Sequence, residues 1–160
     1  DVLSTQQIKA LSIKWPNDIM SANKKICGVL IENNIKKNTI YSSIIGIGLN
    51  VNQEKFPVFL ENASSLKTIM NKEYDLEILL LQLVENLKKR IQLLSLKKYD
   101  LLENDYLNVL YKKGIPTMFK DSNAVLFMGI IVGISAAGNL KIELDDETVK
   151  EFGIKEVSLA

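Results

Sequence analysis

The sequence contains no histidine, and only one cysteine, Cys27, among its 160 residues. Without histidine the chain cannot supply a Ser-His-Asp or Cys-His catalytic group of its own. A zinc site is also disfavoured, because protein zinc sites draw mainly on Cys and His ligands. A single cysteine permits no intrachain disulfide, which fits a reducing compartment, and we expect a cytoplasmic protein. Any chemistry must come from lysine, carboxylates, amides and the backbone.

The sequence also lacks an excess of either charge and any long apolar run. Lys and Arg number 20 and Asp and Glu 19, so the net charge is +1, which gives no signal for nucleic acid or an acidic membrane surface. No segment approaches the roughly 18 apolar residues of a membrane span, and the polar start is no signal peptide. Apolar residues at 47% and charged residues at 24% are typical of a globular protein.

The pattern of the first 50 residues predicts the end of one helix followed by strands. Residues 4–10 are typical of the end of a helix, residues 11–14 of a short strand, and residues 17–18 and 21–23 of turns. Residues 25–33 and 39–50 are rich in strand-forming side chains. The apolar run of the second strand predicts burial on both faces. Residues 51–72 are expected to be irregular.

A long amphipathic helix is predicted after Asp75, a plausible N-cap. Glu85 and Lys89 lie at i, i+4 spacing on its polar side. Its apolar stripe indicates core packing, and the stripe consists of Leu76, Leu79, Leu80, Leu83, Val84, Leu87, Ile91 and Leu94. A second helix is expected over residues 100–111, with Leu101, Leu102, Val109 and Leu110 facing inward.

The composition changes after Gly114. Strand-like runs at 117–120, 125–134, 140–144 and 149–152 alternate with short turn-forming segments. Closely spaced short strands of this kind favour a small all-β barrel. We therefore predict two domains, residues 1–113 and residues 114–160, in an α+β chain.

Three segments carry the residues best suited to chemistry: Lys14-Trp15-Pro16-Asn17-Asp18, then 24–32 with Lys25, Cys27 and Gly28, then 46–52 with Gly46, Gly48 and Asn50. Lysines, a carboxylate, amides and bare backbone suit an anionic transition state beside phosphates and magnesium. Each also has an ordinary interpretation: a solvated lysine, a turn, a core tryptophan. The Gly46–Gly48 pair lacks the third glycine of a dinucleotide fingerprint. Cys27 has no activating base and is interpreted as a small apolar side chain.

The same segments resemble the biotin–protein ligase family. The pentapeptide at 14–18 is that family's signature, and Lys25-Ile-Cys-Gly-Val-Leu-Ile-Glu32 is similar to its next conserved segment. Gly46-Ile-Gly-Leu-Asn-Val-Asn52, Ala63-Ser-Ser-Leu66 and Glu156-Val-Ser-Leu159 are similar to later elements in the same order. The resemblance covers nearly the whole chain.

The resemblance implies a catalytic domain related to class II aminoacyl-tRNA synthetases and lipoate ligases, with a mixed sheet and helices, followed by an SH3-like barrel. It implies ATP-dependent formation of biotinyl-5′-AMP, then transfer of biotin to a lysine of a biotin carboxyl carrier domain. The implied ligands are ATP, Mg²⁺ and biotin. Homodimerisation is a further possibility, and this chain encodes no DNA-binding segment.

Roles follow from the matching positions. The resemblance implies that Lys25 and Lys14 stabilise charge at the α-phosphate, and that Asp18, with Asn17, holds magnesium. Gly28 would let biotin pack on the strand. The resemblance assigns adenine recognition to Asn50, clearance for the nucleotide to Gly48 and a part of the substrate-binding site to Trp15.

The family's Gly-Arg-Gly-rich loop is absent from these 160 residues, and the chain does not begin with Met. We therefore expect a fragment with little or no activity alone. Two alternatives remain: a lipoate–protein ligase, which shares the implied fold but not the Lys-Trp-Pro-Asn-Asp signature, and a non-catalytic binding module that docks a partner on its barrel.

Overall fold

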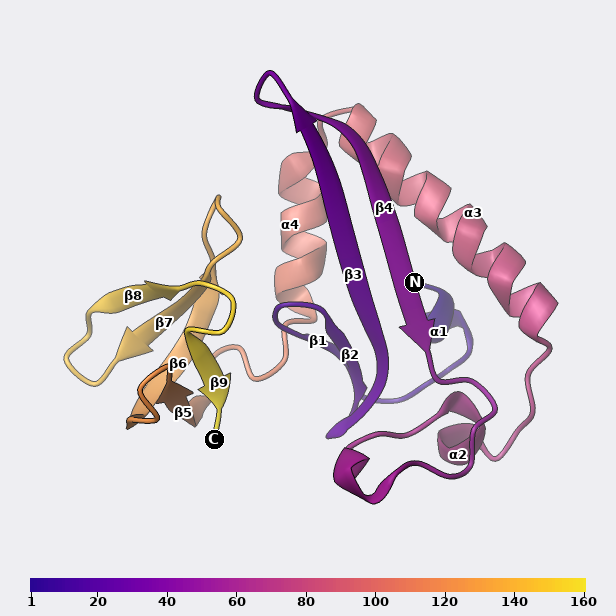
Figure 1. The fold of residues 1–160 in the computed structure, drawn as a ribbon, viewed down its shortest axis with the longest axis horizontal. Coiled ribbons are helices and arrows are strands. Elements are labelled where there is room, and N and C mark those ends of the chain that lie inside the picture. The colour runs from indigo at the N-terminus through magenta and orange to yellow at the C-terminus, as the bar shows by residue number, and fades with distance from the viewer.

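A computed structural model describes all residues, 1–160, and arranges them around two antiparallel sheets (Figure 1). The first sheet has the order β1-β2-β3-β4 and the second has the order β8-β7-β6-β5-β9. The strands are β1 Leu11–Lys14, β2 Asp18–Ser21, β3 Lys24–Lys36, β4 Thr39–Leu49, β5 Pro116–Asp121, β6 Leu126–Ile134, β7 Leu140–Leu144, β8 Val149–Phe152 and β9 Val157–Leu159. The helices are α1 Val2–Thr5, α2 Leu66–Met70, α3 Leu76–Ser95 and α4 Tyr99–Asn108, with a 3₁₀ turn at Val58–Leu60. The predicted α+β class is confirmed.

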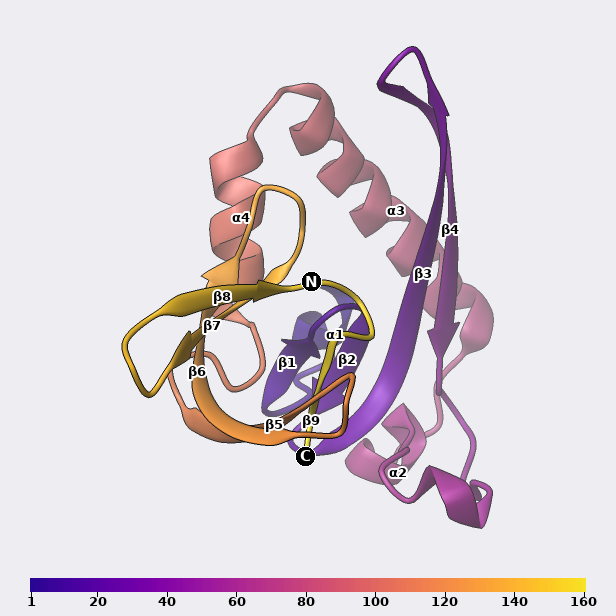
Figure 2. The ribbon, with the colours of Figure 1, turned by 60° about the vertical axis from the view of Figure 1, so that its left-hand side comes forward.

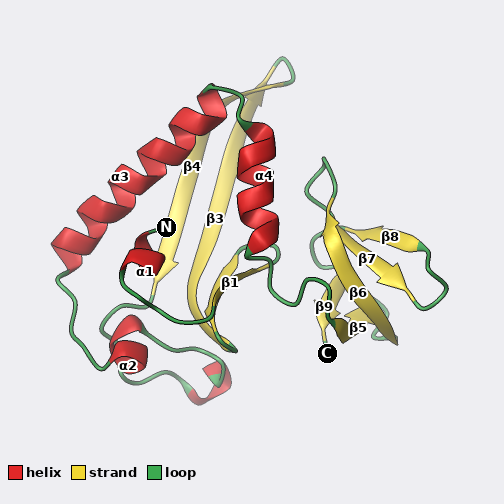
Figure 3. Ribbon diagram, turned by 180° about the vertical axis from the view of Figure 1, so that it is seen from behind, coloured by secondary structure: helices red, strands yellow, loops and turns green.

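Strands β3 and β4 form a long two-stranded ribbon, and α3 and α4 lie on one side of it, toward the viewer in Figure 3. The core of this first unit lies at the base of the ribbon, where β3, α1, α2 and the start of α3 converge. Its buried residues are Val2, Ile8, Ile26, Val51, Leu66, Tyr74 and Leu79. The upper ribbon is exposed, including Leu30 and Ile44 at 62% and 63%. The expectation that residues 39–50 are buried on both faces is therefore wrong, because an apolar run is buried only where another layer packs on it.

Helix α3 begins where the sequence predicts, and the Asp75 carboxylate accepts hydrogen bonds from the amides of Glu77 and Ile78. The Glu85–Lys89 pair is also present, with 3.4 Å between Oε1 and Nζ. The apolar stripe, however, is only partly in the core: Leu79 is buried, whereas Leu76, Leu80, Val84, Ile91 and Leu94 are exposed. Periodicity identifies an apolar face, but burial needs a partner, and only the narrow ribbon base and the neighbouring helices α1 and α4 adjoin this helix.

Helix α4 ends at Asn108, before the predicted limit of residue 111, and two of its four expected core residues are exposed. Leu110 is buried and Leu102 is partly buried, while Leu101 and Val109 are exposed. The backbone after the helix instead joins the first sheet, since the amides of Ile13 and Tyr111 bond to the carbonyls of Val109 and Ile13.

Three short elements were misjudged from sequence. The first helix covers Val2–Thr5 rather than residues 4–10, Asp18–Ser21 is a strand rather than part of a turn, and α2 lies within the supposedly irregular segment 51–72. Strand β2 is held by pairing on both sides, with β1 and β3. Such cross-strand pairing is a tertiary effect that a four-residue window does not reveal.

The second unit starts at Pro116, just after Gly114, whose φ of 74° suits glycine. The predicted strands are all present, and β9 is added at the end of the sheet beside β5 (Figure 2). Phe119, Phe127 and Phe152 stack with successive ring centroids 5.6 Å apart. Phe119 belongs to a second core with Leu110, Ile131, Leu140, Ile142 and Val157, and the partly buried Phe127 and Phe152 pack against it. Closure of this sheet into an SH3-like barrel, and the division at 113/114, stay predictions.

Trp15 links the two units. The indole packs against the second core, and its Nε1 donates a hydrogen bond to the Gly138 carbonyl at 2.9 Å. The Gly114 amide, just before the second unit, donates to the Ile131 carbonyl on β6. Within the first unit, the Tyr111 hydroxyl donates to Asn23 Oδ1 at 2.8 Å. The turn at 15–17, which directly precedes Asp18 on β2, thus lies next to the second unit. None of the helices has the length and apolar character needed to cross a membrane.

Candidate functional site

A single transverse row crosses all four strands of the first sheet. Lys14 on β1 is opposite Asp18 on β2, Asp18 is opposite Gly28 on β3, and Gly28 is opposite Gly48 on β4. Directly opposed residues of neighbouring strands project from the same face of a sheet. Four residues from the three sequence segments singled out above therefore share one face.

Lys25 joins this row through its side chain. Its Nζ lies 2.6 Å from Asp18 Oδ1, and it would lie 3.5 Å from a Cβ added to Gly28. The ammonium and the carboxylate thus meet directly over the bare backbone of Gly28. The side chains are 46% and 23% exposed, and a pair this accessible contributes only about 0–1 kcal/mol to stability. The pair is therefore better placed to bind a ligand than to hold the fold.

The segment at 63–66 fixes the backbone of Lys25. The Lys25 amide donates to the Asn62 carbonyl at 2.6 Å, and the Ser64 amide donates to the Lys25 carbonyl at 2.9 Å. Ser65 is fully buried and its hydroxyl caps α2 by accepting from the Thr68 amide at 3.1 Å. These bonds join residues 62–64 to the backbone of Lys25, and the Ser65 cap starts α2 directly after them.

Two asparagines hold the edges of the site. The Asn17 amide Nδ2 donates to the Val29 carbonyl at 2.9 Å, and the Val29 amide returns a bond to the Asn17 carbonyl. This exchange ties the turn before Asp18 to β3. Asn50 Nδ2 donates to the Ser64 carbonyl at 3.0 Å, so its amide group is already joined to the segment that positions Lys25.

The opposite face of the sheet is apolar. Ile13, Ile19, Cys27 and Leu49 form the neighbouring row and line a cavity of about 280 Å³ between the sheet and α3. Cys27 is 4% exposed, and burial raises its pKa to about 11. At neutral pH its thiol stays protonated, so the interpretation of Cys27 as an apolar side chain and not a nucleophile is supported.

No cluster of three or more Asp, Glu, Cys or His side chains is present that could hold a metal ion by protein ligands alone. Asp18 is the single carboxylate on the site row. Magnesium commonly binds proteins through only one or two carboxylates and takes its other ligands from water and phosphate oxygens. The donor set therefore fits a magnesium ion brought in with a nucleotide, and not a protein-enclosed metal centre.

Structure adds three residues that the sequence did not single out. Tyr111, Lys155 and Ser158 line a cavity of about 230 Å³ together with Lys14, Trp15 and Asp18. Lys155 and Ser158 come from the second unit. They lie about 140 residues from the signature pentapeptide, and no local pattern links the two segments. Trp15, expected to contact substrate, contributes to this cavity while its indole NH is engaged with Gly138.

Comparisons with known proteins agree with this arrangement. The model of the biotin/lipoate A/B protein ligase family matches residues 3–50. The bifunctional ligase/repressor BirA proteins of Bacillus spizizenii and Bacillus subtilis are each 44% identical over 66 residues, which is 39% of this chain and 20% of the relative. The matched part thus spans about a fifth of these curated proteins.

Solved structures match over nearly the full chain. The apo structure of biotin protein ligase from Aquifex aeolicus is 27% identical, with a TM-score of 0.78, over 99% of this chain and 69% of that protein. The same ligase in complex with biotin and ATP gives the same identity and TM-score over 99% and 66%. The two-sheet arrangement therefore extends to a protein that binds biotin and ATP.

Proposed function

Because the chain belongs to the biotin–protein ligase family, we propose that it forms part of an enzyme that makes biotinyl-5′-AMP from biotin and ATP. The enzyme then transfers biotin to a lysine of a biotin carboxyl carrier domain. One observation carries this proposal: the Lys25 ammonium and the Asp18 carboxylate lie 2.6 Å apart over Gly28, on the row that also holds Lys14 and Gly48. Two ammonium groups, a carboxylate and two glycines suit a site where an acyl carboxylate and a nucleotide phosphate react above exposed backbone.

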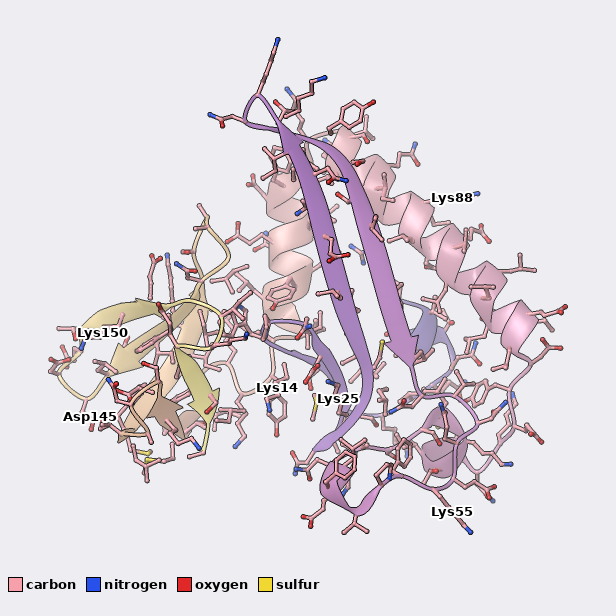
Figure 4. The ribbon with its side chains drawn as sticks, in the orientation of Figure 1. Lys14, Lys25, Lys55, Lys88, Asp145 and Lys150 are labelled. Carbon is pink, nitrogen blue, oxygen red and sulfur yellow. The ribbon has the colours of Figure 1, made fainter.

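The first step places developing negative charge on the α-phosphate. A biotin carboxylate oxygen attacks this phosphorus, the bond to the β-phosphate oxygen breaks, and pyrophosphate leaves. Lys25, and more distantly Lys14, would stabilise that charge from fixed positions, which is commonly the largest contribution an active site makes. Labelled sticks show Lys25 and Lys14 on neighbouring parts of the first sheet (Figure 4).

Asp18, together with the Asn17 side chain, would hold magnesium in this step. The ion would supply neutralisation of the phosphate oxygens. Asp18 is paired with Lys25 in this structure, and ligand binding would separate the two so that each contacts an oppositely charged partner. The pair thus keeps both groups in place at little cost before the substrates arrive.

In the second step the carrier lysine attacks the biotinyl carbonyl, and AMP leaves. Gly28 would give the acyl group access to the backbone and Gly48 would give clearance for the nucleotide, since a Cβ at either position would project onto the site face. Asn50 would mark the adenine end. Its Nδ2 is held by Ser64, so its Oδ1 is the side-chain atom left to accept from the exocyclic adenine amine.

Biotin-dependent exchange of labelled pyrophosphate into ATP tests the proposal. It is measured for the 160-residue chain and for a longer natural protein that contains it, and we expect strong exchange only where a Gly-Arg-Gly-rich loop is also present. Lys25→Ala should lower exchange about 100-fold or more, by analogy with loss of other charge-stabilising groups. Lys36→Ala, at the far end of the same strand, should leave it unchanged.

Three results would contradict the assignment. Exchange that is supported by lipoate and not by biotin would identify a lipoate ligase. Exchange that survives Lys25→Ala intact would remove the site described above from the reaction. A docking module with no enzymatic role would show no exchange in any form of the protein.

A further inference from the structure

Lys25 reaches the site face because β3 carries a β-bulge. Side chains alternate between the two faces of a strand, so Lys25 and Gly28, three positions apart, would project from opposite faces of a regular strand. The register between β2 and β3 shifts between Ile19 and Met20, which leaves Ile26 as an extra residue in β3. This extra residue returns Lys25 to the face that carries Gly28. Bulges next to active sites commonly re-aim a side chain in this way.

The bulge is held on two sides. The Ile26 side chain is fully buried in the first core, and its carbonyl accepts from the Asn50 amide at 2.8 Å. Strand β4 ends at Leu49, and residues 62–64 then take its place as the parallel neighbour of Lys25. These residues come just before α2, at the base of the ribbon where β3 begins (Figure 1). The bulge therefore cannot relax without breaking hydrogen bonds to both neighbouring segments.

Asn50 joins the two segments that hold the bulge. Its Nδ2 donates to the Ser64 carbonyl at 3.0 Å, and the Ser64 amide donates to the Lys25 carbonyl at 2.9 Å. The Asn50 carbonyl accepts from the Leu66 amide at 3.0 Å, while its own amide is bonded to Ile26. The backbone groups and Nδ2 of Asn50 are thus all used to position the segments around Lys25, and Oδ1 is left for a ligand.

We propose that Asn50 is a positioning residue for Lys25, in addition to its contact with adenine. Its side chain holds Ser64, and through Ser64 the bulge, in the arrangement that aims the Lys25 ammonium at the α-phosphate. The inference rests on the proposed function and gives Asn50 a second task within it. When Oδ1 accepts from the exocyclic adenine amine, the amide group is polarised and Nδ2 becomes a stronger donor to Ser64. The adenine end of ATP thereby stabilises the arrangement of the lysine at the reacting end.

Purine riboside triphosphate, which lacks the exocyclic amine of ATP, separates the two tasks. Biotin-dependent pyrophosphate exchange into this analogue is measured at saturating biotin and nucleotide, in the form of the protein that supports exchange with ATP. If Asn50 only contacts the adenine amine, Asn50→Ala should not slow exchange into the analogue. If Asn50 also positions Lys25, a loss of about tenfold should remain, which is a usual size for coupled residues of one hydrogen-bonded network.

The same substitution in a Lys25→Ala protein shows whether the loss acts through the lysine. Without an ammonium group to aim, Asn50→Ala should slow exchange by less than about twofold further. A general weakening of the fold would instead slow exchange equally in both backgrounds. Asn50→Asp provides a second variant, because it keeps an acceptor oxygen but loses the Nδ2 donor. It should retain the preference for ATP over the analogue while losing the same rate, and it carries the comparison if Asn50→Ala does not fold.

Asn52→Ala is the matched control, since Asn52 is a comparable anchor two residues further along the chain. Its Nδ2 donates to the Tyr74 carbonyl at 2.8 Å, and its Oδ1 accepts from the Tyr74 amide at 3.0 Å. These bonds do not involve residues 62–64. Asn52→Ala should therefore lower the melting temperature, because it leaves backbone groups unpaired, but it should not slow exchange at temperatures where the protein is folded.

The outcomes separate this inference from the proposed function. Unchanged exchange into the analogue for Asn50→Ala, or an equal loss with and without the Lys25 amine, would overturn the positioning role while leaving the ligase assignment intact. A loss for Asn52→Ala as large as that for Asn50→Ala would overturn it too, as would failure of both Asn50 variants to fold, which would show a purely structural residue. A parent protein without biotin-dependent exchange would overturn both proposals.

Discussion

Gly28→Ala should weaken ligand binding and slow the reaction without harming the fold. A Cβ at this position would lie 3.5 Å from Lys25 Nζ and 3.7 Å from Asp18 Oδ1, which are ordinary contact distances. Alanine also loses less conformational freedom on folding than glycine. We therefore expect the free energy of unfolding to stay constant or to rise by about 0.5–1 kcal/mol. Chemical denaturation without ligands measures this first part of the prediction.

The new methyl group would nevertheless occupy the surface on which the acyl group is proposed to lie. It projects about 1.5 Å above the Cα, and a displacement of about 1 Å at a reacting centre can cost about 100-fold in rate. At a ligand concentration of about 100 times the parent dissociation constant, the ligand stabilises the parent protein by about 2.7 kcal/mol. Tenfold weaker binding would lower this stabilisation to about 1.4 kcal/mol. The increase in melting temperature that biotin and ATP produce should therefore be about half as large as in the parent protein.

Gly133→Ala is the matched control, since an added Cβ there meets only Leu107 Cδ2 at 3.8 Å and lies in the second sheet. It should retain both the ligand-induced shift in melting temperature and pyrophosphate exchange. If Gly28→Ala kept full ligand stabilisation and exchange, the acyl group would not lie on this face. If instead Gly28→Ala unfolded, the steric reasoning for this row would be wrong.

Two further predictions concern stability. Gly129→Ala should lower the free energy of unfolding by about 1–3 kcal/mol in denaturant titrations. The reason is that its Cβ would lie 2.4 Å from Ile142 Cγ2 in a filled core. An unchanged free energy of unfolding would show that β7 shifts to accommodate the added methyl group. Cys27 should make stability fall between about pH 9 and 11. Its pKa is raised to about 11 in the folded state, so the unfolded thiol ionises first and the unfolded state gains. At about 1.36 kcal/mol per pKa unit, the loss is about 2–3 kcal/mol, and it should be absent from the pH profile of Cys27→Ala; identical profiles would contradict it.

Local signals were sufficient for much of this chain. The cap at Asp75 was recognisable because its carboxylate needs only the next two or three amides of its own helix. The strands of the second unit were visible because turn-forming residues bound each of them. The signature pentapeptide and the three segments after it also identified the family, because the residue types and the order of these segments can be compared without knowledge of the fold.

Burial could not be read in the same way. The stripe on α3 and the run at 39–50 are both apolar, yet Leu80 and Ile44 are exposed at 60% and 63%. A pattern specifies which face is apolar, whereas burial depends on whether another layer lies against that face. Strand β2 was missed for a related reason, because its four residues are held by neighbours on both sides rather than by their own propensity.

By itself, the sequence determined the residue types available for chemistry: lysines, one signature carboxylate, amides and glycines, with no histidine. Only the tertiary structure decided that Lys14, Asp18, Gly28 and Gly48 form one row across four strands and that Lys25 reaches over it. It alone brought Lys155 and Lys14 to the lining of one cavity. The physical reason is that strand register and the packing of two units set distances between segments far apart in the chain, and no local spacing encodes them.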